Sequence, residues 1–233
     1  RITEVEYAYF AGGEPLITEE HYKMLDTWLE AGNNTLKIDY TTNFSKMNLG
    51  NKHAFDYWNK FENVNVGASL DASWERGEYM RTGTIWKDTV QNRRDMMREC
   101  PDIRFFIAPT ISLYNVLHLP DFHKEWVEEG LVQPDAISLA NTLFEPDYMR
   151  AQNLPIELKQ QVRRKYEAHI EYLNSIGVDD TEKWQSIITF VERKKPKISN
   201  IVTFTEFNTR LDRIRKESFV DVFPELKDLL QHA

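Results

Sequence analysis

The sequence has little cysteine, fewer positive than negative charges and no long apolar run. Its 233 residues include one cysteine, Cys100. One thiol excludes a disulfide within the chain and any metal site made of several of its own thiolates. Such sparing use of cysteine is typical of a reducing compartment, so we expect a cytoplasmic protein.

The formal net charge of −8 disfavours general binding of nucleic acid, which requires a basic surface. No apolar run approaches the roughly 20 residues that span a bilayer. We therefore expect neither nucleic acid nor a membrane as a partner. The composition, 41% hydrophobic and 28% charged, is that of a globular chain with a sizeable core.

Strand-like and helix-like segments alternate through the first 140 residues, which predicts βα units and a parallel sheet. Strands are predicted at 5–10, 36–42, 64–70, 103–110 and 136–140, and helices at 19–31, 52–61, 86–99 and 121–129. A polar loop is expected between 71 and 85.

After Asn141 the pattern becomes helical, with helices predicted at 158–176 and 184–194. A capping-box pattern, Thr203 and Glu206, predicts the start of a last helix that ends near Lys216. Residues 219–224 form an apolar anchor. We therefore divide the chain into a strand-containing domain, 1–145, and a helical C-terminal extension, 146–233.

Parallel sheets bind their ligands at the carboxyl ends of the strands. The residues expected there are small, polar and mixed in charge, a set that suits a zwitterionic ligand with hydroxyl groups. They are Gly12, Gly13, Glu14, Thr42, Asn43, Ser69, Asp71, Arg76, Arg81, Thr110, Ser112, Asn115, Ser138, Asn141 and Glu145. His118 and His123, separated by Pro120, lack metal-ligand spacing and are expected on the surface at a helix entry.

Several of these segments together resemble radical S-adenosylmethionine enzymes. Gly12-Gly13-Glu14-Pro15 is similar to the family's glycine–glycine–glutamate motif, and Thr42-Asn43 matches a Thr-Asn on its third strand. Ala68-Ser69-Leu70-Asp71-Ala72 resembles the fourth-strand segment, and Arg81-Thr82-Gly83 resembles the Arg-x-Gly loop after it. The resemblance covers about residues 5–141, and the tail, from Arg215 to Leu226, is similar to a twitch-domain subgroup.

The resemblance implies a partial (β/α) barrel with a C-terminal helical appendage, and it implies S-adenosylmethionine as cofactor. Gly12, Gly13 and Glu14 would hold the methionine end, and Arg81 would neutralise the carboxylate. Ser69, Asn43 and Asp71 would fix the methionine tail or ribose, and Asn115 would touch the adenosine.

In that family a [4Fe–4S] cluster, reduced by a donor such as flavodoxin or ferredoxin, cleaves S-adenosylmethionine. The 5′-deoxyadenosyl radical then abstracts a hydrogen from a substrate, here a peptide or a small molecule, free or carrier-bound. The family's C-x3-C-x2-C loop is absent from this sequence, which begins with Arg1 and soon enters a strand. We therefore expect an N-terminally truncated barrel whose cluster ligands lie upstream, and a chain that is inactive by itself.

Two other functions stay open. Paired carboxylates among Glu14, Asp71 and Glu145 could hydrolyse a glycosidic bond by acid–base catalysis on a barrel. The chain could also be a degenerate, non-catalytic barrel that retains only a ligand pocket.

Overall fold

The computed structural model describes residues 2–232 and divides into two compact units. The first comprises Arg1–Leu70, Thr84–Ala108 and Leu131–Ile137, and the second comprises Asp71–Gly83, Pro109–Gly130 and Ser138–Ala233. The second unit thus includes two segments that lie before residue 145. The division of the sequence at that residue stays a prediction.

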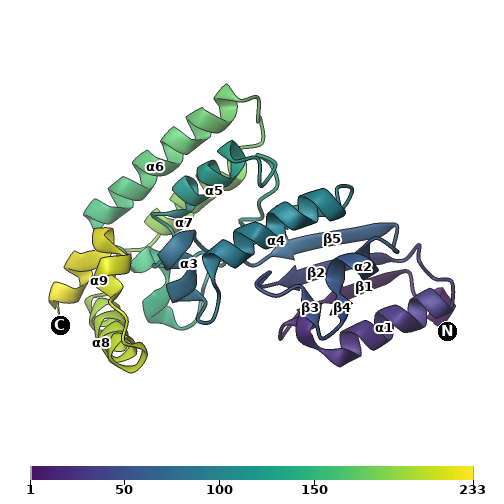
Figure 1. The fold of residues 1–233 in the computed structure, drawn as a ribbon. Helices are drawn as coiled ribbons and strands as arrows, with labels where there is room; N and C mark the ends of the chain where they lie inside the picture. Colours follow the sequence, from purple (N-terminus) through teal and green to yellow (C-terminus); the bar gives the residue numbers. More distant parts are fainter. Residues whose placement is uncertain (1, 233) are drawn as a thin grey trace. The chain divides into compact units, whose positions relative to one another are not determined.

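The first unit is built on a four-stranded parallel sheet, as the alternation of the sequence predicted (Figure 1). The strand order is β1-β2-β5-β6, with β1 at Tyr7–Phe10, β2 at Lys37–Thr42, β5 at Asn63–Ala68 and β6 at Arg104–Ile107. Two short strands, β3 (Asn48–Leu49) and β4 (Lys52–His53), form a separate antiparallel pair.

The prediction of a fifth strand at 136–140 is wrong. An isolated bridge joins Ile107 to Ile137, and no strand forms there. The amide of Ile137 donates to the carbonyl of Asp135 at 2.9 Å, a local bond that turns the backbone away from an extended course. A closed or partial barrel therefore does not follow from the strands of the first unit alone.

Helices cover one face of this sheet. They are α1 (Glu19–Glu30), α2 (Ala54–Trp58) and α4 (Trp86–Glu99), and α4 has the bounds that the sequence predicted. Phe10, Tyr40, Val66 and Phe105 are register partners across the four strands, so their side chains share a face. The helix contacts on that face are Phe10–His21 (4.7 Å between ring centroids), Tyr40–Trp58 (5.4 Å) and the Arg93 guanidinium over Phe105 (4.2 Å).

The opposite face of the sheet is polar and partly exposed. The Tyr7 hydroxyl donates to Asp39 at 3.1 Å, and the Asn65 amide donates to the same carboxylate at 2.6 Å. The hydroxyls of Tyr9 and Thr41 lie 2.8 Å apart. This alternation gives the sheet one apolar face under helices and one face with hydrogen-bonded polar side chains, which also carries Phe106.

The second unit is helical, which confirms the helices predicted in the tail. Its helices are α3 (Trp74–Met80), α5 (Leu119–Glu128), α6 (Ile156–Ser175), α7 (Glu182–Glu192), α8 (Ile198–Arg215) and α9 (Phe219–Val222). Short 3-10 helices complete the chain: η1 (Ile2–Glu4) and η2 (Pro15–Ile17) in the first unit, and η3 (Asp147–Met149), η4 (Ala151–Asn153) and η5 (Pro224–His232) in the second.

Two local predictions in this unit are wrong. The expected polar loop contains α3, and the expected capping box lies inside a helix, because α8 begins at Ile198. The Thr203 hydroxyl instead donates to the carbonyl of Ser199 at 3.0 Å, as hydroxyls inside helices do.

A cluster of aromatic rings holds α3, α8 and α9 together. Tyr114 contacts Phe204 at 5.2 Å between centroids, and Phe219 contacts Phe223 at the same distance. Tyr79 of α3 meets the edge of Phe223 at 5.4 Å. Phe219 and Phe223 are fully buried, so the predicted apolar anchor near the C-terminus is confirmed.

The expectation that His118 and His123 lie on the surface is also wrong. His123 is fully buried, with its Nδ1 2.9 Å from Nε2 of His169 on α6. The Nε2 of His118 lies 2.9 Å from the Ser73 hydroxyl. Helix α5 packs on α6, and the sequence near its start did not indicate which face would be covered.

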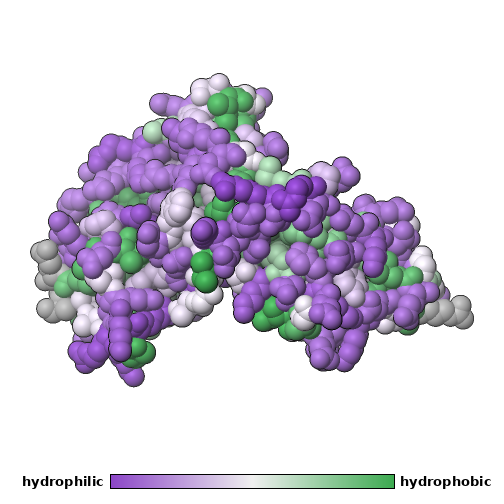
Figure 2. All heavy atoms as spheres, in the orientation of Figure 1, coloured by the Kyte–Doolittle hydropathy of each residue, from purple (hydrophilic) through white to green (hydrophobic). Residues whose placement is uncertain are grey.

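Within residues 2–232 no helix combines the length and hydropathy needed to cross a membrane. The face drawn in Figure 2 is predominantly hydrophilic, with small separate hydrophobic areas.

Candidate functional site

Glu14 lies at the carboxyl edge of β1 and links it to β2. Its Oε1 accepts a hydrogen bond from the Thr42 hydroxyl at 2.6 Å, and its Oε2 accepts one from the amide of Asn43 at 2.8 Å. Oε1 also accepts a hydrogen bond from the amide of Leu16 at 3.3 Å, and this bond caps the short helix η2. The carboxylate is therefore used to hold two strand ends together.

The preceding glycines form an open turn. Gly12 and Gly13 are exposed, and a Cβ added to either would meet no atom within 4 Å. Gly12 has φ of +103°, a conformation that side chains disfavour. A ligand can therefore approach the backbone of this turn closely, while Glu14 fixes where the turn lies.

Asn43 and Ser69 complete this edge of the first unit. The Asn43 side chain forms an Asx turn, with its Oδ1 accepting from the amide of Ser45 at 3.0 Å and from the Ser45 hydroxyl at 2.8 Å. The amide of Ser69 donates to the carbonyl of Thr42 at 2.7 Å, so the two strand ends are adjacent. We call Gly12, Gly13, Glu14, Asn43 and Ser69 the glycine-turn site.

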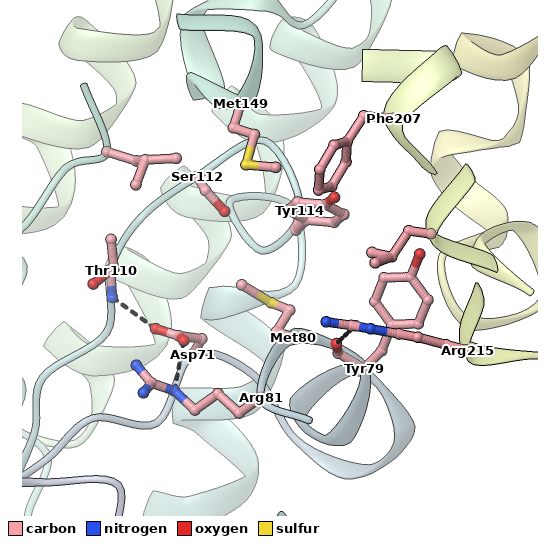
Figure 3. Close-up of a pocket in the computed structure, with 12 residues that line it drawn as sticks. Asp71, Tyr79, Met80, Arg81, Thr110, Ser112, Tyr114, Met149, Phe207 and Arg215 are labelled. Atoms are coloured by element: carbon pink, nitrogen blue, oxygen red, sulfur yellow. Dashed lines mark hydrogen bonds and ion pairs between the residues drawn. The ribbon is translucent and has the colours of Figure 1, made fainter. Parts of the chain in front are cut away.

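The other predicted site residues, Asp71, Arg81 and Asn115, lie together in the second unit. Asp71 accepts from Nε of Arg81 at 2.8 Å and from the amide of Thr110 at 2.7 Å (Figure 3). Burial raises the pKa of the Asp71 carboxyl, and the positive charge of Arg81 opposes part of that rise. The carboxylate thus orients Arg81 and the loop that follows β6.

Asn115 is fully buried and serves the same loops. Its amide nitrogen donates to the carbonyls of Asp71 and Thr110, both at 3.0 Å, and its Oδ1 accepts from the amide of Ser112 at 2.8 Å. These bonds engage both ends of the side-chain amide. The predicted contact between Asn115 and adenosine stays a prediction that the geometry does not favour.

The Asp71–Arg81 pair borders a cavity of about 360 Å³ that lies wholly within the second unit. We call it the second-unit cavity. Its lining residues come from α3 and the turn beside it, from the loop after β6, and from the C-terminal region. They are Asp71, Tyr79, Met80, Arg81, Thr110, Ser112, Tyr114, Leu143, Met149, Phe207, Leu211 and Arg215.

Most of these lining residues were not predicted from the sequence. Phe207, Leu211 and Arg215 recur at intervals of four on α8, so an apolar helix face that ends in arginine was the available signal. Ile214, at the neighbouring spacing on this helix, lies outside the cavity and is 68% exposed. Tyr79, Met80 and Met149 carried no local sign of a cavity.

The chain holds no multi-ligand metal site among its described residues. No group of three or more His, Cys, Asp or Glu side chains there is arranged to bind a metal ion. Cys100 is buried, 3.9 Å from the carbonyl oxygen of Phe55, and burial raises the pKa of its thiol to about 11. These residues do not fit a [4Fe–4S] cluster, which requires several thiolates.

No protein-family model matches the sequence, and a search of curated proteins gives no match.

Proposed function

We propose that this chain is the S-adenosylmethionine-binding part of a radical S-adenosylmethionine enzyme, and that its sheet belongs to a partial (β/α) barrel. The observation that carries the proposal is the exposed Gly12–Gly13 turn at the end of β1, fixed by Glu14 to the end of β2. A zwitterionic methionine group needs carbonyl acceptors for its ammonium, and a turn without Cβ atoms offers them at close range.

The distribution of helices supports the barrel. In a (β/α) barrel all helices lie outside one closed sheet, whereas a doubly wound sheet has helices on both faces. Here α1, α2 and α4 cover the face of Phe10 and Tyr40. The other face, with Tyr7, Asp39 and Asn65, is polar as a ligand-facing wall would be.

In this proposal the residues of the glycine-turn site divide the work of binding the ligand and of fixing the turn. The backbone of Gly12 and Gly13 accepts the methionine ammonium. Glu14 positions that turn through Thr42 and Asn43. Ser69, half-buried just after β5, offers a hydroxyl at the same carboxyl edge of the sheet. The expected contact of Arg81 with the ligand carboxylate stays a separate prediction.

The full reaction needs groups that this chain does not hold. Three cysteines for a [4Fe–4S] cluster, an electron donor such as flavodoxin or ferredoxin, and a peptide or small-molecule substrate are proposed partners of the complete enzyme. The coding sequence before Arg1 tests this part directly. A C-x3-C-x2-C loop within the roughly hundred preceding residues would support the proposal. A reading frame with no cysteines there would contradict the radical enzyme and favour the non-catalytic barrel that only binds a ligand.

The binding of S-adenosylmethionine to the 233-residue chain tests the glycine turn, and isothermal calorimetry measures it. Gly13→Val should abolish binding but leave thermal unfolding nearly unchanged, because Gly13 is exposed and the space around its Cβ position is open. Gly12→Ala and Gly32→Ala form a matched pair at positive φ, +103° and +72°, with open space around both. We expect Gly12→Ala alone to weaken binding.

Two results would contradict the proposal. One is the absence of saturable binding to the unaltered chain, and the other is equal binding by Gly13→Val. The hydrolase alternative has less support, since the Glu14 oxygens already accept three donors within the chain. Glu145, whose side chain is 79% exposed, lies 3.1 Å from the guanidinium of Arg150.

A further inference from the structure

The second-unit cavity contains an arginine whose hydrogen-bond donors are only partly engaged by the protein. Arg215 is the last residue of α8, and its Nη1 donates to the backbone carbonyl of Tyr79 at 3.0 Å. Its nearest carboxylate oxygen, on Glu217, is 3.8 Å from Nη1, beyond hydrogen-bonding distance. Nε and Nη2 of Arg215 donate to no other described residue.

No carboxylate among the lining residues is left to pair with Arg215, and Glu217, which lies outside the lining, approaches Nη1 only to 3.8 Å. Asp71 is bound by Arg81 and by the amide of Thr110, so that carboxylate is already paired. The lining therefore carries one positive charge in excess. A cation at a partly enclosed apolar wall attracts an anion more strongly than one in free solvent.

The two tyrosines of the lining cannot supply the missing negative charge. Tyr79 donates its hydroxyl to Asp212 at 2.9 Å, and Tyr114 donates to Asn208 at the same distance. Burial raises the pKa of both hydroxyls well above the ordinary value, so both stay neutral. These bonds also hold the two rings against α8.

The wall opposite the charged groups is aromatic and thioether-rich. Figure 3 shows Met149, Phe207 and Tyr114 gathered on one side, with Met80 between Arg81 and Arg215. Methionine sulfur and aromatic rings pack well on a flat aromatic body. The volume, about 360 Å³, lies within the range of small-molecule sites, roughly 300–1,000 Å³.

We infer that the second-unit cavity binds a small organic anion with an aromatic body. Its carboxylate or similar oxyanion lies on the guanidinium of Arg215, whose two free N–H directions match such a group. Its ring lies against Phe207, Met149 and Tyr114. This inference concerns the second unit alone and does not need the proposed reaction.

A pair of fluorescent probes separates the charge from the aromatic body. 1-Anilinonaphthalene-8-sulfonate carries an anion, and N-phenyl-1-naphthylamine has the same rings without it. We expect the chain to bind one sulfonate probe per molecule. Arg215→Gln should weaken the sulfonate probe about tenfold, as expected when one hydrogen bond to a charged group is lost, and change the neutral probe less than twofold.

Two further variants serve as controls. Arg213→Gln removes the same charge from an exposed position on α8 and should leave the binding of both probes unchanged. Phe207→Ala, at a half-buried position, should weaken the binding of both probes. Equal loss of sulfonate binding in Arg213→Gln and Arg215→Gln would overturn the inference, and so would unchanged binding in Arg215→Gln.

A competition experiment on the unaltered chain tests the same point without any variant. Indole-3-acetate should displace the sulfonate probe at least tenfold more effectively than indole-3-acetamide, since only the acetate offers an anion to Arg215. Equal displacement by the two compounds would overturn the inference. Neither measurement contains S-adenosylmethionine, so failure here is distinguishable from failure of the proposed function.

Discussion

Glu14 and Thr42, 28 positions apart in the sequence, share a hydrogen bond of 2.6 Å between a carboxylate oxygen and a hydroxyl. The bond joins the turn after β1 to the last residue of β2. It gives the glutamate that follows the two glycines a structural task, separate from any contact with a ligand.

Glu14→Gln should lower the free energy of unfolding by about 1–3 kcal/mol, measured by urea denaturation. The carboxylate accepts from Thr42, Asn43 and Leu16, and a side-chain amide would turn an N–H toward one of these donors. Glu20→Gln, at an exposed position of α1, is the control and should change stability by less than about 0.5 kcal/mol. Equal stability of the two variants would contradict this role.

Gly67→Ala should destabilise the first unit by about 1–3 kcal/mol through overpacking. A Cβ at this position would lie 2.7 Å from the ring of Phe106 and 3.2 Å from the carbonyl oxygen of Tyr40. Urea denaturation of the single variants and of Gly67→Ala/Phe106→Ala measures the coupling. The cost of Gly67→Ala should fall when the Phe106 ring is absent, and an unchanged cost would refute the clash.

Mild acid should destabilise the protein, because burial lowers the pKa of several histidines. The pKa of His21 falls from 6.5 to about 4, and that of His118, His123 and His169 to about 4, 3 and 4. Below pH 6.5 the unfolded chain binds protons that the folded chain excludes. The stability contributed by the neutral rings is therefore lost progressively as the pH falls from 6.5 toward 4.

The variant His21→Gln isolates one of these groups. Between pH 7.5 and 5.0 the unaltered chain should lose about 2 kcal/mol more than the variant, since pH 5.0 lies about 1.5 units below the unfolded pKa of His21. Urea denaturation at the two pH values measures the difference. Asp71, whose pKa is raised, gains stability for the folded state as the pH falls, but this contribution is the same in the unaltered chain and in the variant. Identical losses would contradict the assignment to His21.

The 233-residue chain should not cleave S-adenosylmethionine, even after treatment with ferrous iron, sulfide and dithionite. Its one cysteine, Cys100, is buried and cannot supply the several thiolates of a [4Fe–4S] cluster. Liquid chromatography for 5′-deoxyadenosine is the measurement. Cys100→Ala should give the same blank result, and a product from the unaltered chain would refute the prediction.

Much of the first unit was determined by the sequence itself. The alternation of strands and helices predicted β1, β2, β5 and β6 in a parallel sheet, and α4 has the predicted bounds, Trp86–Glu99. Helix α1 ends at Glu30, close to the predicted end at residue 31, and Gly32, at φ of +72°, follows that end as glycine often does. These features depend on periodicity and on single residues at helix ends, which are local properties.

The tertiary structure decided the features that depend on distant partners. Helix α3 lies in a segment that looked like a loop, and it is held by Tyr79, whose hydroxyl donates to Asp212 on α8. His123 is buried because α6 supplies His169 beside it. The second-unit cavity likewise joins Arg81 to Arg215 across 134 positions of sequence. No local pattern encodes such pairs, since burial and long-range contacts arise only when the helices pack.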